Sequence, residues 1–222
     1  MKKDNILPDM SPVAEGLLRI HKVISRGLKI SIEKCNEHPG KNGMTSGEME
    51  GFLKYILTLK RIINSHHLSE DEIAFPYFRN YIEAPYDRLK DDHNTVIKIL
   101  DRFDKCLEEL PSNGAGSLLE ALDELNKLWE SHIKIEEENF SAEKLQQVIG
   151  MKEQLNLTEK LSDHGMKNSG PGPLTLPFLL YNLEVKDRET IMMSLPWFVK
   201  KVLVPIIWRK QWKSMSPFLL NQ

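Results

Sequence analysis

The chain has 222 residues, of which 41% are hydrophobic and 28% are charged, and its formal net charge at pH 7 is -2. This profile is that of an ordinary globular protein that can bury a substantial core. The near-neutral balance argues against nucleic acid as a partner. The two cysteines, Cys35 and Cys106, are far apart and lack CxxC spacing, which argues against a disulfide framework or a thiolate zinc site.

The N-terminal stretch MKKDNILPDMSPVAEG has no apolar run after its two lysines, so it lacks the pattern of a secretory signal. No uninterrupted apolar stretch approaches the length of a membrane span. We therefore expect a soluble, cytoplasmic protein without a transmembrane span.

The first amphipathic helix is expected over residues 13–37, where Ser11 and Pro12 supply an N-cap and a first-turn proline. A glycine- and asparagine-rich loop, HPGKNGMTSGE, follows it. The second helix should begin near Thr45. It should end by Phe75, because the following proline disfavours the helical conformation in the residue before it.

A third helix is expected over residues 86–110 and a fourth over residues 117–149, separated by the loop PSNGAGS. Four long helices with short connections predict an all-α fold, an up-down-up-down four-helix bundle that occupies residues 1–150. Residues 151–222 are expected to form a C-terminal helical extension.

Four histidines lie within the apolar stripes of these helices, one on each, and two of them are followed by a glutamate four residues later. Residues four apart share one face of a helix, so a bundle would direct all six side chains into its interior. A buried glutamate or imidazole without partners is costly, so this set indicates a bound cation. The candidate metal ligands are His21, His66, Glu70, His93, His132 and Glu136.

Two neighbouring residues are further candidates. His67 lies about 100 degrees around the helix from His66, so it is an additional ligand, a hydrogen-bond partner of a ligand or a surface residue. Glu137 is rotated away from the stripe and would reach the site only if the helix distorts. The other nearby histidines and acidic residues are expected to be exposed: His38, Asp71, Glu72, Glu138 and His164.

Imidazole and carboxylate donors without thiolates suit iron or manganese, and zinc or copper less distinctively. Two glutamates can each bridge two ions while histidines cap the ends. We therefore expect two iron ions joined by an oxo or hydroxo group, with zinc or manganese as alternatives. Such a site leaves a coordination position open for a small diatomic ligand.

The residues around these histidines resemble a known family. The segments HHLSEDEIAFP and SHIKIEEENF are similar to the paired signatures HHxxEExxxFP and HIxxEExxxF of hemerythrin-like (HHE cation-binding) domains. The segments IHKVI and DDHNTVI resemble the single-histidine motifs on that family's first and third helices. The resemblance covers residues from about 13 to 145. It implies a four-helix bundle in which the six candidate residues are iron ligands.

The chain also departs from the oxygen-carrying hemerythrins, which have two histidines one turn apart on the third helix. Here Leu89 and Ile97 stand four residues before and after His93, so one ligand is missing. Their last carboxylate is an aspartate five residues after the histidine, where this chain has Glu137. The resemblance is therefore closer to proteins that sense oxygen or iron, or that repair iron–sulfur clusters.

The expected function is that of a non-haem di-iron protein that binds or senses dioxygen, nitric oxide or iron. One alternative is a di-iron oxidase or reductase, or an iron–sulfur-repair-type enzyme, although the adjacent N-terminal cysteines usual in the repair proteins are absent. Another alternative is a metal-binding interaction module. Only a measurement of turnover would distinguish an enzyme from a sensor. The sequence does not decide between them, so both classes stay open.

The C-terminal segment begins with the glycine- and proline-rich NSGPGPLTLP and continues as two or three short helices interrupted by Pro196 and Pro205. The segment is rich in large aromatic side chains, which dominate cores and interfaces. We expect the segment to pack on the bundle or on a partner, as in a homodimer, and it could also cover the open metal position. Its aromatic residues are Phe178, Tyr181, Trp197, Phe198, Trp208, Trp212 and Phe218.

Overall fold

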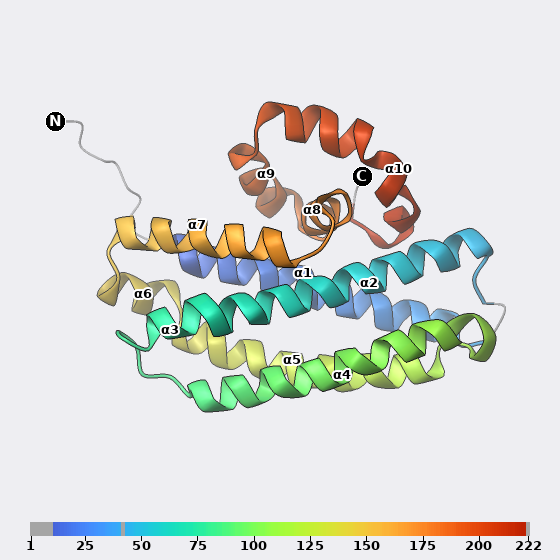
Figure 1. Ribbon diagram of the computed structural model, residues 1–222, viewed down its shortest axis with the longest axis horizontal. Helices are drawn as coiled ribbons and strands as arrows, with labels where there is room; N and C mark the ends of the chain where they lie inside the picture. The colour runs from blue at the N-terminus through green and yellow to red at the C-terminus, as the bar shows by residue number, and fades with distance from the viewer. Residues whose placement is uncertain (1–10, 41–42, 221–222) are drawn as a thin grey trace.

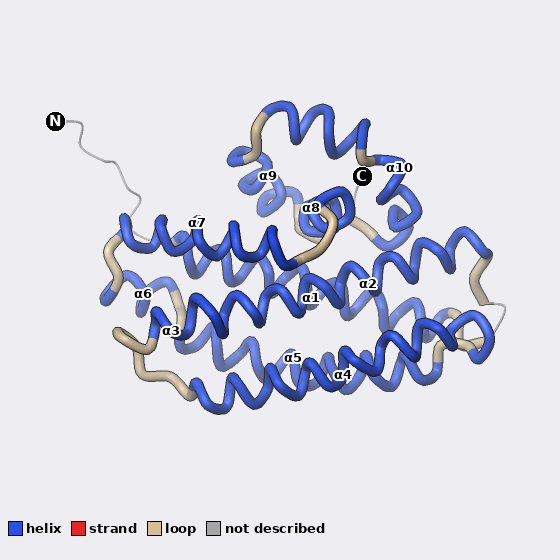
Figure 2. The backbone as a smooth tube through the Cα atoms, viewed as in Figure 1, coloured by secondary structure: helices blue, strands red, loops and turns tan. Residues whose placement is uncertain are grey.

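The computed structural model describes residues 11–40 and 43–220, and within these ranges every regular element is helical and no strand occurs (Figure 2). The predicted all-α class is therefore confirmed. The expectation for the N-terminal stretch falls largely on residues 1–10, outside the described part. The α-helices are α1 (Pro12–Glu37), α2 (Ser46–Ser69), α3 (Phe75–Phe78), α4 (Tyr86–Asn113), α5 (Gly116–Asn139), α6 (Ala142–Val148), α7 (Met151–Asn168), α8 (Gly172–Tyr181), α9 (Val185–Ser194) and α10 (Arg209–Trp212).

The four long helices α1, α2, α4 and α5 lie side by side (Figure 1). Helix α1 packs against α2 and α5, and α4 packs against the same two neighbours. This arrangement is consistent with a hemerythrin-type helical bundle. The up-down-up-down order of the four helices stays a prediction.

The helix starts follow local sequence chemistry. The Ser11 side chain accepts a hydrogen bond from the Ala14 amide at the start of α1, directly before Pro12. Thr45 and Glu48 form a reciprocal capping box at the start of α2. Each cap satisfies amide donors that the first helical turn leaves unpaired, which fixes where the helix begins.

The second helix ends before Phe75, as predicted, but the proline does not end helical structure at that point. The chain passes from α2 through a π-helical segment, η1 (Glu70–Ala74), into α3. The Phe75 amide donates to the carbonyl of Glu70, five residues back. This wider turn relieves the clash that a proline ring makes with the preceding turn, so Pro76 enters the first turn of α3.

The fourth long helix is shorter than predicted, because α5 ends at Asn139 and the Ser141 side chain caps a separate helix, α6. The following helix, α7, begins the predicted C-terminal extension, although the sequence did not specify its bounds. It packs along α1 and α2, so the described chain adds a fifth long helix beside these two (Figure 1).

The apolar core is divided into two clusters by the candidate ligands. The larger cluster contains Val23 and Ile24 of α1 and Ile63 of α2. The smaller one contains Val13 of α1 and Phe75 of α3. Along α1 and α4, the polar residues fall between the residues that enter one cluster and those that enter the other. The same holds for α2 and α5 when each is followed beyond its end, to Ala74 and Phe140 of the smaller cluster. The fold therefore buries a polar layer inside the bundle, with apolar packing on both sides.

The C-terminal segment lies over α2 (Figure 1). Besides α8 to α10, it contains a π-helical segment, η2 (Val199–Ile207), and a 3-10 helix, η3 (Lys213–Phe218). A Cβ on Gly51 of α2 would lie 2.0 Å from the backbone oxygen of Ser214, so only glycine permits this close approach. Phe178, Trp212 and Phe218 are buried and join the larger apolar cluster.

Within the described residues, no single helix has both the length and the apolar character needed to cross a membrane. Helices α9 and η2 pass that test only when taken together, and they meet at a bend of 113°.

Candidate metal centre

Seven buried donor side chains meet in the polar layer. Helix α1 contributes one, the α2–η1 junction three, α4 one and α5 two. None is more than 8% exposed, so solvent does not compensate their polarity. They comprise the six predicted ligands and His67: His21, His66, His67, Glu70, His93, His132 and Glu136.

The donor atoms form two groups that share Glu70. In each group, one donor atom from every residue lies within 4.8 Å of the others. The first group is His21, His66, Glu70 and Glu136, and the second is His67, Glu70, His93 and His132. Each has the number and chemistry of donors that can hold one metal ion.

Each buried glutamate faces one histidine from each group. The Oε1 of Glu70 lies 3.5 Å from Nε2 of His66, and its Oε2 lies 3.5 Å from Nε2 of His93. The Oε2 of Glu136 lies 3.1 Å from Nε2 of His21, and its Oε1 lies 3.3 Å from Nε2 of His132. The two oxygens of each carboxylate therefore point to different groups, which is the arrangement that a bridging ligand requires.

Three carboxylates outside the layer orient the imidazoles. The Nδ1 atoms of His21, His93 and His132 lie 2.8, 3.0 and 3.3 Å from carboxylate oxygens. A bond at Nδ1 fixes the ring and leaves Nε2 directed at the centre. The three carboxylates belong, in the same order, to Glu137, Asp71 and Asp92.

Some of these roles differ from the sequence expectations. Glu137 lies beside Nδ1 of His21, and Asp71, expected to be solvated, binds His93. Asp92 was not singled out, although it directly precedes His93. His164 of α7 is half-buried rather than exposed, and its Nε2 lies 2.9 Å from a Glu72 oxygen. Periodicity misses such contacts because they form between helices.

The buried layer contains donors and acceptors without hydrogen-bond partners. They include both oxygens of Glu70 and Glu136, Nε2 of His21 and His66, and both ring nitrogens of His67. The ion-pair distances given above therefore lack hydrogen-bond geometry. Leaving so many polar atoms unpaired in a protein interior is costly. Metal ions would satisfy them together, so these residues fit a metal-binding role.

Burial and mutual repulsion perturb the ionisation of the donors. Burial and the neighbouring Glu136 carboxylate raise the pKa of Glu70 well above its ordinary value. Burial lowers the pKa of His66 and His67 well below the ordinary value, and nearby imidazoles lower it further. Burial opposes ionisation of Glu136, but the facing imidazoles outweigh it and lower its pKa. The neutral imidazoles of His66 and His67 and the ionised carboxylate of Glu136 are forms that can bind a metal cation, whereas the Glu136 and Glu137 carboxylates raise the pKa of His21 and favour its proton.

Aromatic rings enclose the layer. The Trp129 indole lies edge-on to His21, with ring centroids 5.4 Å apart, and its Nε1 donates to the Ser25 hydroxyl. Phe75 stacks on His93 at 5.6 Å. These contacts hold the imidazoles of His21 and His93 in place and shield them from bulk water.

Substitution of an orienting carboxylate is expected to weaken metal binding without abolishing it. For Asp71→Ala, the freed His93 ring should lower iron affinity by roughly 10–100-fold, the usual effect of losing such a partner. Competition titration with a chelator measures this affinity. Glu138→Ala, at an exposed position on α5, is the control. Unchanged affinity in Asp71→Ala would show that His93 needs no such support.

Metal affinity is expected to fall as the pH falls. Because the pKa of Glu70 is raised above its ordinary value of 4.5, its proton competes with the metal at pH values where an ordinary carboxyl is already ionised. Iron(II) titrations at several pH values, with the released protons counted, measure the effect. An affinity that does not change with pH, without proton release, would contradict this assignment.

The cysteines contribute no thiolate to the site. Cys35 and Cys106 are both free and buried, and burial raises the pKa of the Cys35 thiol to about 12. The donor set is therefore nitrogen and oxygen only, as the sequence predicted.

A comparison with known proteins identifies the family. The family described as the hemerythrin HHE cation binding domain matches residues 13–142, more than half of the chain. No curated protein and no solved structure gives a significant match. The matched range contains all seven buried donors. The chain therefore belongs to the hemerythrin HHE cation-binding domain family.

Proposed function

We propose that this protein is a non-haem di-iron protein that binds or senses a small molecule. The observation that carries the proposal is the position of the two buried glutamates, each of which faces imidazoles of both donor groups. Bridging carboxylates between two histidine-capped ions are the known solution for such a set in helical bundles. Family membership and the absence of thiolates favour iron.

The proposed ligand set assigns two histidines to one ion and three to the other. His21 and His66 hold the first ion, and Glu70 and Glu136 bridge. The second ion takes His67, His93 and His132. Both ring nitrogens of His67 are buried without partners within the second donor group, which supports its inclusion. Glu137 is assigned to orienting His21.

The unequal histidine count suggests an open coordination position on the side of His21 and His66. An iron pair bound here would supply one-electron chemistry and a position for a small molecule such as dioxygen or nitric oxide. The protein residues orient the imidazoles through their Nδ1 partners and exclude bulk water through the aromatic enclosure. A change in the charge of the centre would act directly on all four long helices, as a sensor requires.

The proposal extends to the arrangement of the chain. The short connections from α1 to α2 and from α4 to α5 support an up-down-up-down bundle. Residues 151–222 are proposed as a C-terminal extension of that bundle, and the burial of Phe178, Trp212 and Phe218 against the larger apolar cluster supports it.

The experiment is an anaerobic iron(II) titration followed by exposure to dioxygen or nitric oxide. The proposal predicts saturation at two ions per chain and a change in the near-ultraviolet and visible spectrum after exposure. The double variant His66→Ala/Glu70→Ala should lose this stoichiometry. Full iron content in that variant would refute the ligand assignment. Repeated consumption of dioxygen or nitric oxide would instead identify the protein as an oxidase or reductase.

A further inference from the structure

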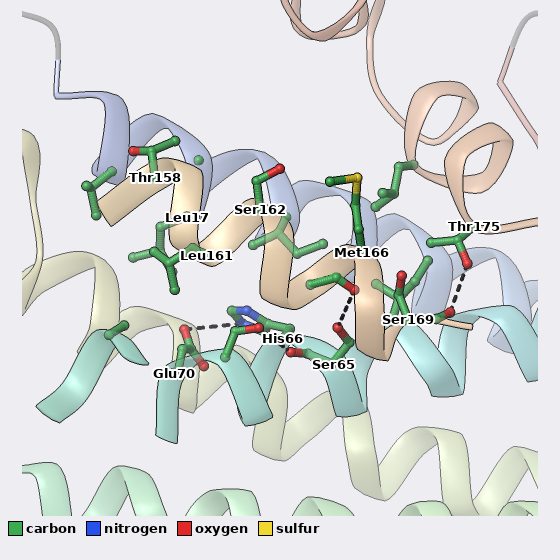
Figure 3. Close-up of a pocket in the computed structure, with 18 of the residues that line it drawn as sticks. Leu17, Ser65, His66, Glu70, Thr158, Leu161, Ser162, Met166, Ser169 and Thr175 are labelled. Atoms are coloured by element: carbon green, nitrogen blue, oxygen red, sulfur yellow. Dashed lines mark hydrogen bonds and ion pairs between the residues drawn. The ribbon is translucent and has the colours of Figure 1, made fainter. Parts of the chain in front are cut away.

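A large cavity adjoins one side of the metal centre. It has a volume of about 460 Å³ and lies between α1, α2, α7 and the C-terminal segment. Figure 3 shows His66 and Glu70 on the α2 side of this cavity, with Leu161 on the α7 side. These two are the only donors of the centre in its lining, which omits His21, His67, His93, His132 and Glu136. The cavity therefore meets the centre at the shared Glu70 and at His66, a donor of the group proposed to have the open position.

The walls of this cavity offer few polar groups to a ligand. Three hydroxyl groups in the lining already donate to backbone carbonyl oxygens. The Ser65 hydroxyl donates to the carbonyl of Gly165, the Ser69 hydroxyl to the carbonyl of Ser65, and the Thr175 hydroxyl to the carbonyl of Ser169. Among the residues that the structure describes, no lysine or arginine lines the cavity. Much of the remaining lining is aliphatic or aromatic and includes Leu17, Ile20, Phe75, Phe78, Leu176 and Leu179. Such walls favour an uncharged, apolar molecule.

The volume exceeds what a diatomic molecule needs. One water occupies about 30 Å³ in the liquid, whereas this cavity is within the range of sites for organic ligands, roughly 300–1,000 Å³. Met166 lines the cavity and is 67% exposed, so the cavity reaches the surface at α7 (Figure 3). Leu195 also lines it, and Met193 and Trp197 beside it in the sequence are exposed.

We propose that this cavity is a binding site for an uncharged, hydrocarbon-rich molecule of about ten carbons or more, held with one end against the His66 and Glu70 side of the metal centre. Much of the cavity wall comes from α7 and the C-terminal segment, which follow the four long helices in the sequence. The proposal goes beyond the binding of diatomic molecules, because an organic ligand beside the centre would control access to the open position.

The direct test is binding of the uncharged fluorophore N-phenyl-1-naphthylamine, followed by its displacement. The full chain, in metal-free and iron-loaded forms, should bind one equivalent with an increase in fluorescence. Decanol should displace it at least tenfold more effectively than decanoate from the metal-free form, since no lysine or arginine in the described part of the chain lines the cavity to neutralise a carboxylate. No saturable binding, or equal displacement by both compounds, would overturn the proposal.

A cavity-filling variant locates the binding. Gly16 lines the cavity, and a Cβ built on it meets nothing within 4 Å, so Gly16→Leu has room to place a side chain there. Gly47→Leu is the matched control, because Gly47 is equally unobstructed but lies at the start of α2 and outside the lining. Gly16→Leu should lower fluorophore affinity at least tenfold, and Gly47→Leu should leave it unchanged.

A second blocking variant, Leu161→Trp, fills the cavity from α7. Thermal unfolding shows which variants are folded, and equal fluorophore affinity in the wild type and in a folded blocking variant would overturn the proposal. Iron content is measured in the same samples. Lost fluorophore binding with two ions retained supports this site while leaving the di-iron proposal intact. Loss of iron with fluorophore binding retained would count against the di-iron centre alone.

Discussion

Replacement of Glu70 with alanine is expected to reduce the iron content from two ions per chain to one or fewer. Glu70 is the only residue common to both donor groups, so its loss removes a donor from each. Iron content after anaerobic loading and desalting measures the effect. Glu138→Ala, an exposed change on α5, should retain two ions.

The stability of the metal-free Glu70→Ala variant provides a second result. In the metal-free protein, the buried Glu70 carboxyl has no hydrogen-bond partner, and its pKa is raised by burial and by Glu136. Alanine removes this cost and leaves a small cavity. The metal-free variant should therefore unfold within about 1 kcal/mol of the metal-free wild type or be more stable. Two ions retained in this variant, or a loss of stability above about 3 kcal/mol, would contradict Glu70 as a metal bridge.

Iron loading is expected to raise the thermal unfolding midpoint of the wild type by about 10 °C. A ligand at a thousand times its Kd stabilises the folded state by about 4 kcal/mol. In a chain of this size, each kcal/mol shifts the midpoint by roughly 2–4 °C. The stabilisation has a structural source, because bound metal would satisfy the unpaired atoms of the polar layer.

Calorimetry of metal-free and iron-loaded protein measures this shift, and the double variant His66→Ala/Glu70→Ala is the control. The variant should show little change on addition of iron. An equal shift in wild type and variant would place the stabilising iron outside the polar layer.

The sequence predicted which polar residues are buried together more accurately than it predicted the helix ends. Helical periodicity places a polar residue among apolar ones, and this signal was clear for His21, His93 and His132 because each lies in a regular helix. It could not decide the position of His67, because this residue lies about 100 degrees around α2 from His66 and so at the edge of the apolar stripe. His67 faces the same layer as His66, and its environment became clear only from the fold.

The missed features have a common physical cause. The contacts of Asp71 and Asp92 with imidazoles join different helices, and no pattern within one helix encodes them. Helix α7 falls within the predicted C-terminal extension, but the sequence did not specify that it would pack along α1 and α2. The cavity beside α7 could not be predicted either, because its walls come from helices that are distant in the sequence.

The most direct test of the central claim is a crystal structure of the iron-loaded protein with anomalous diffraction recorded on both sides of the iron absorption edge. The account predicts two iron peaks about 3–4 Å apart, both between the carboxylates of Glu70 and Glu136. A single peak, or peaks outside the layer formed by His21, His66, His93 and His132, would contradict it.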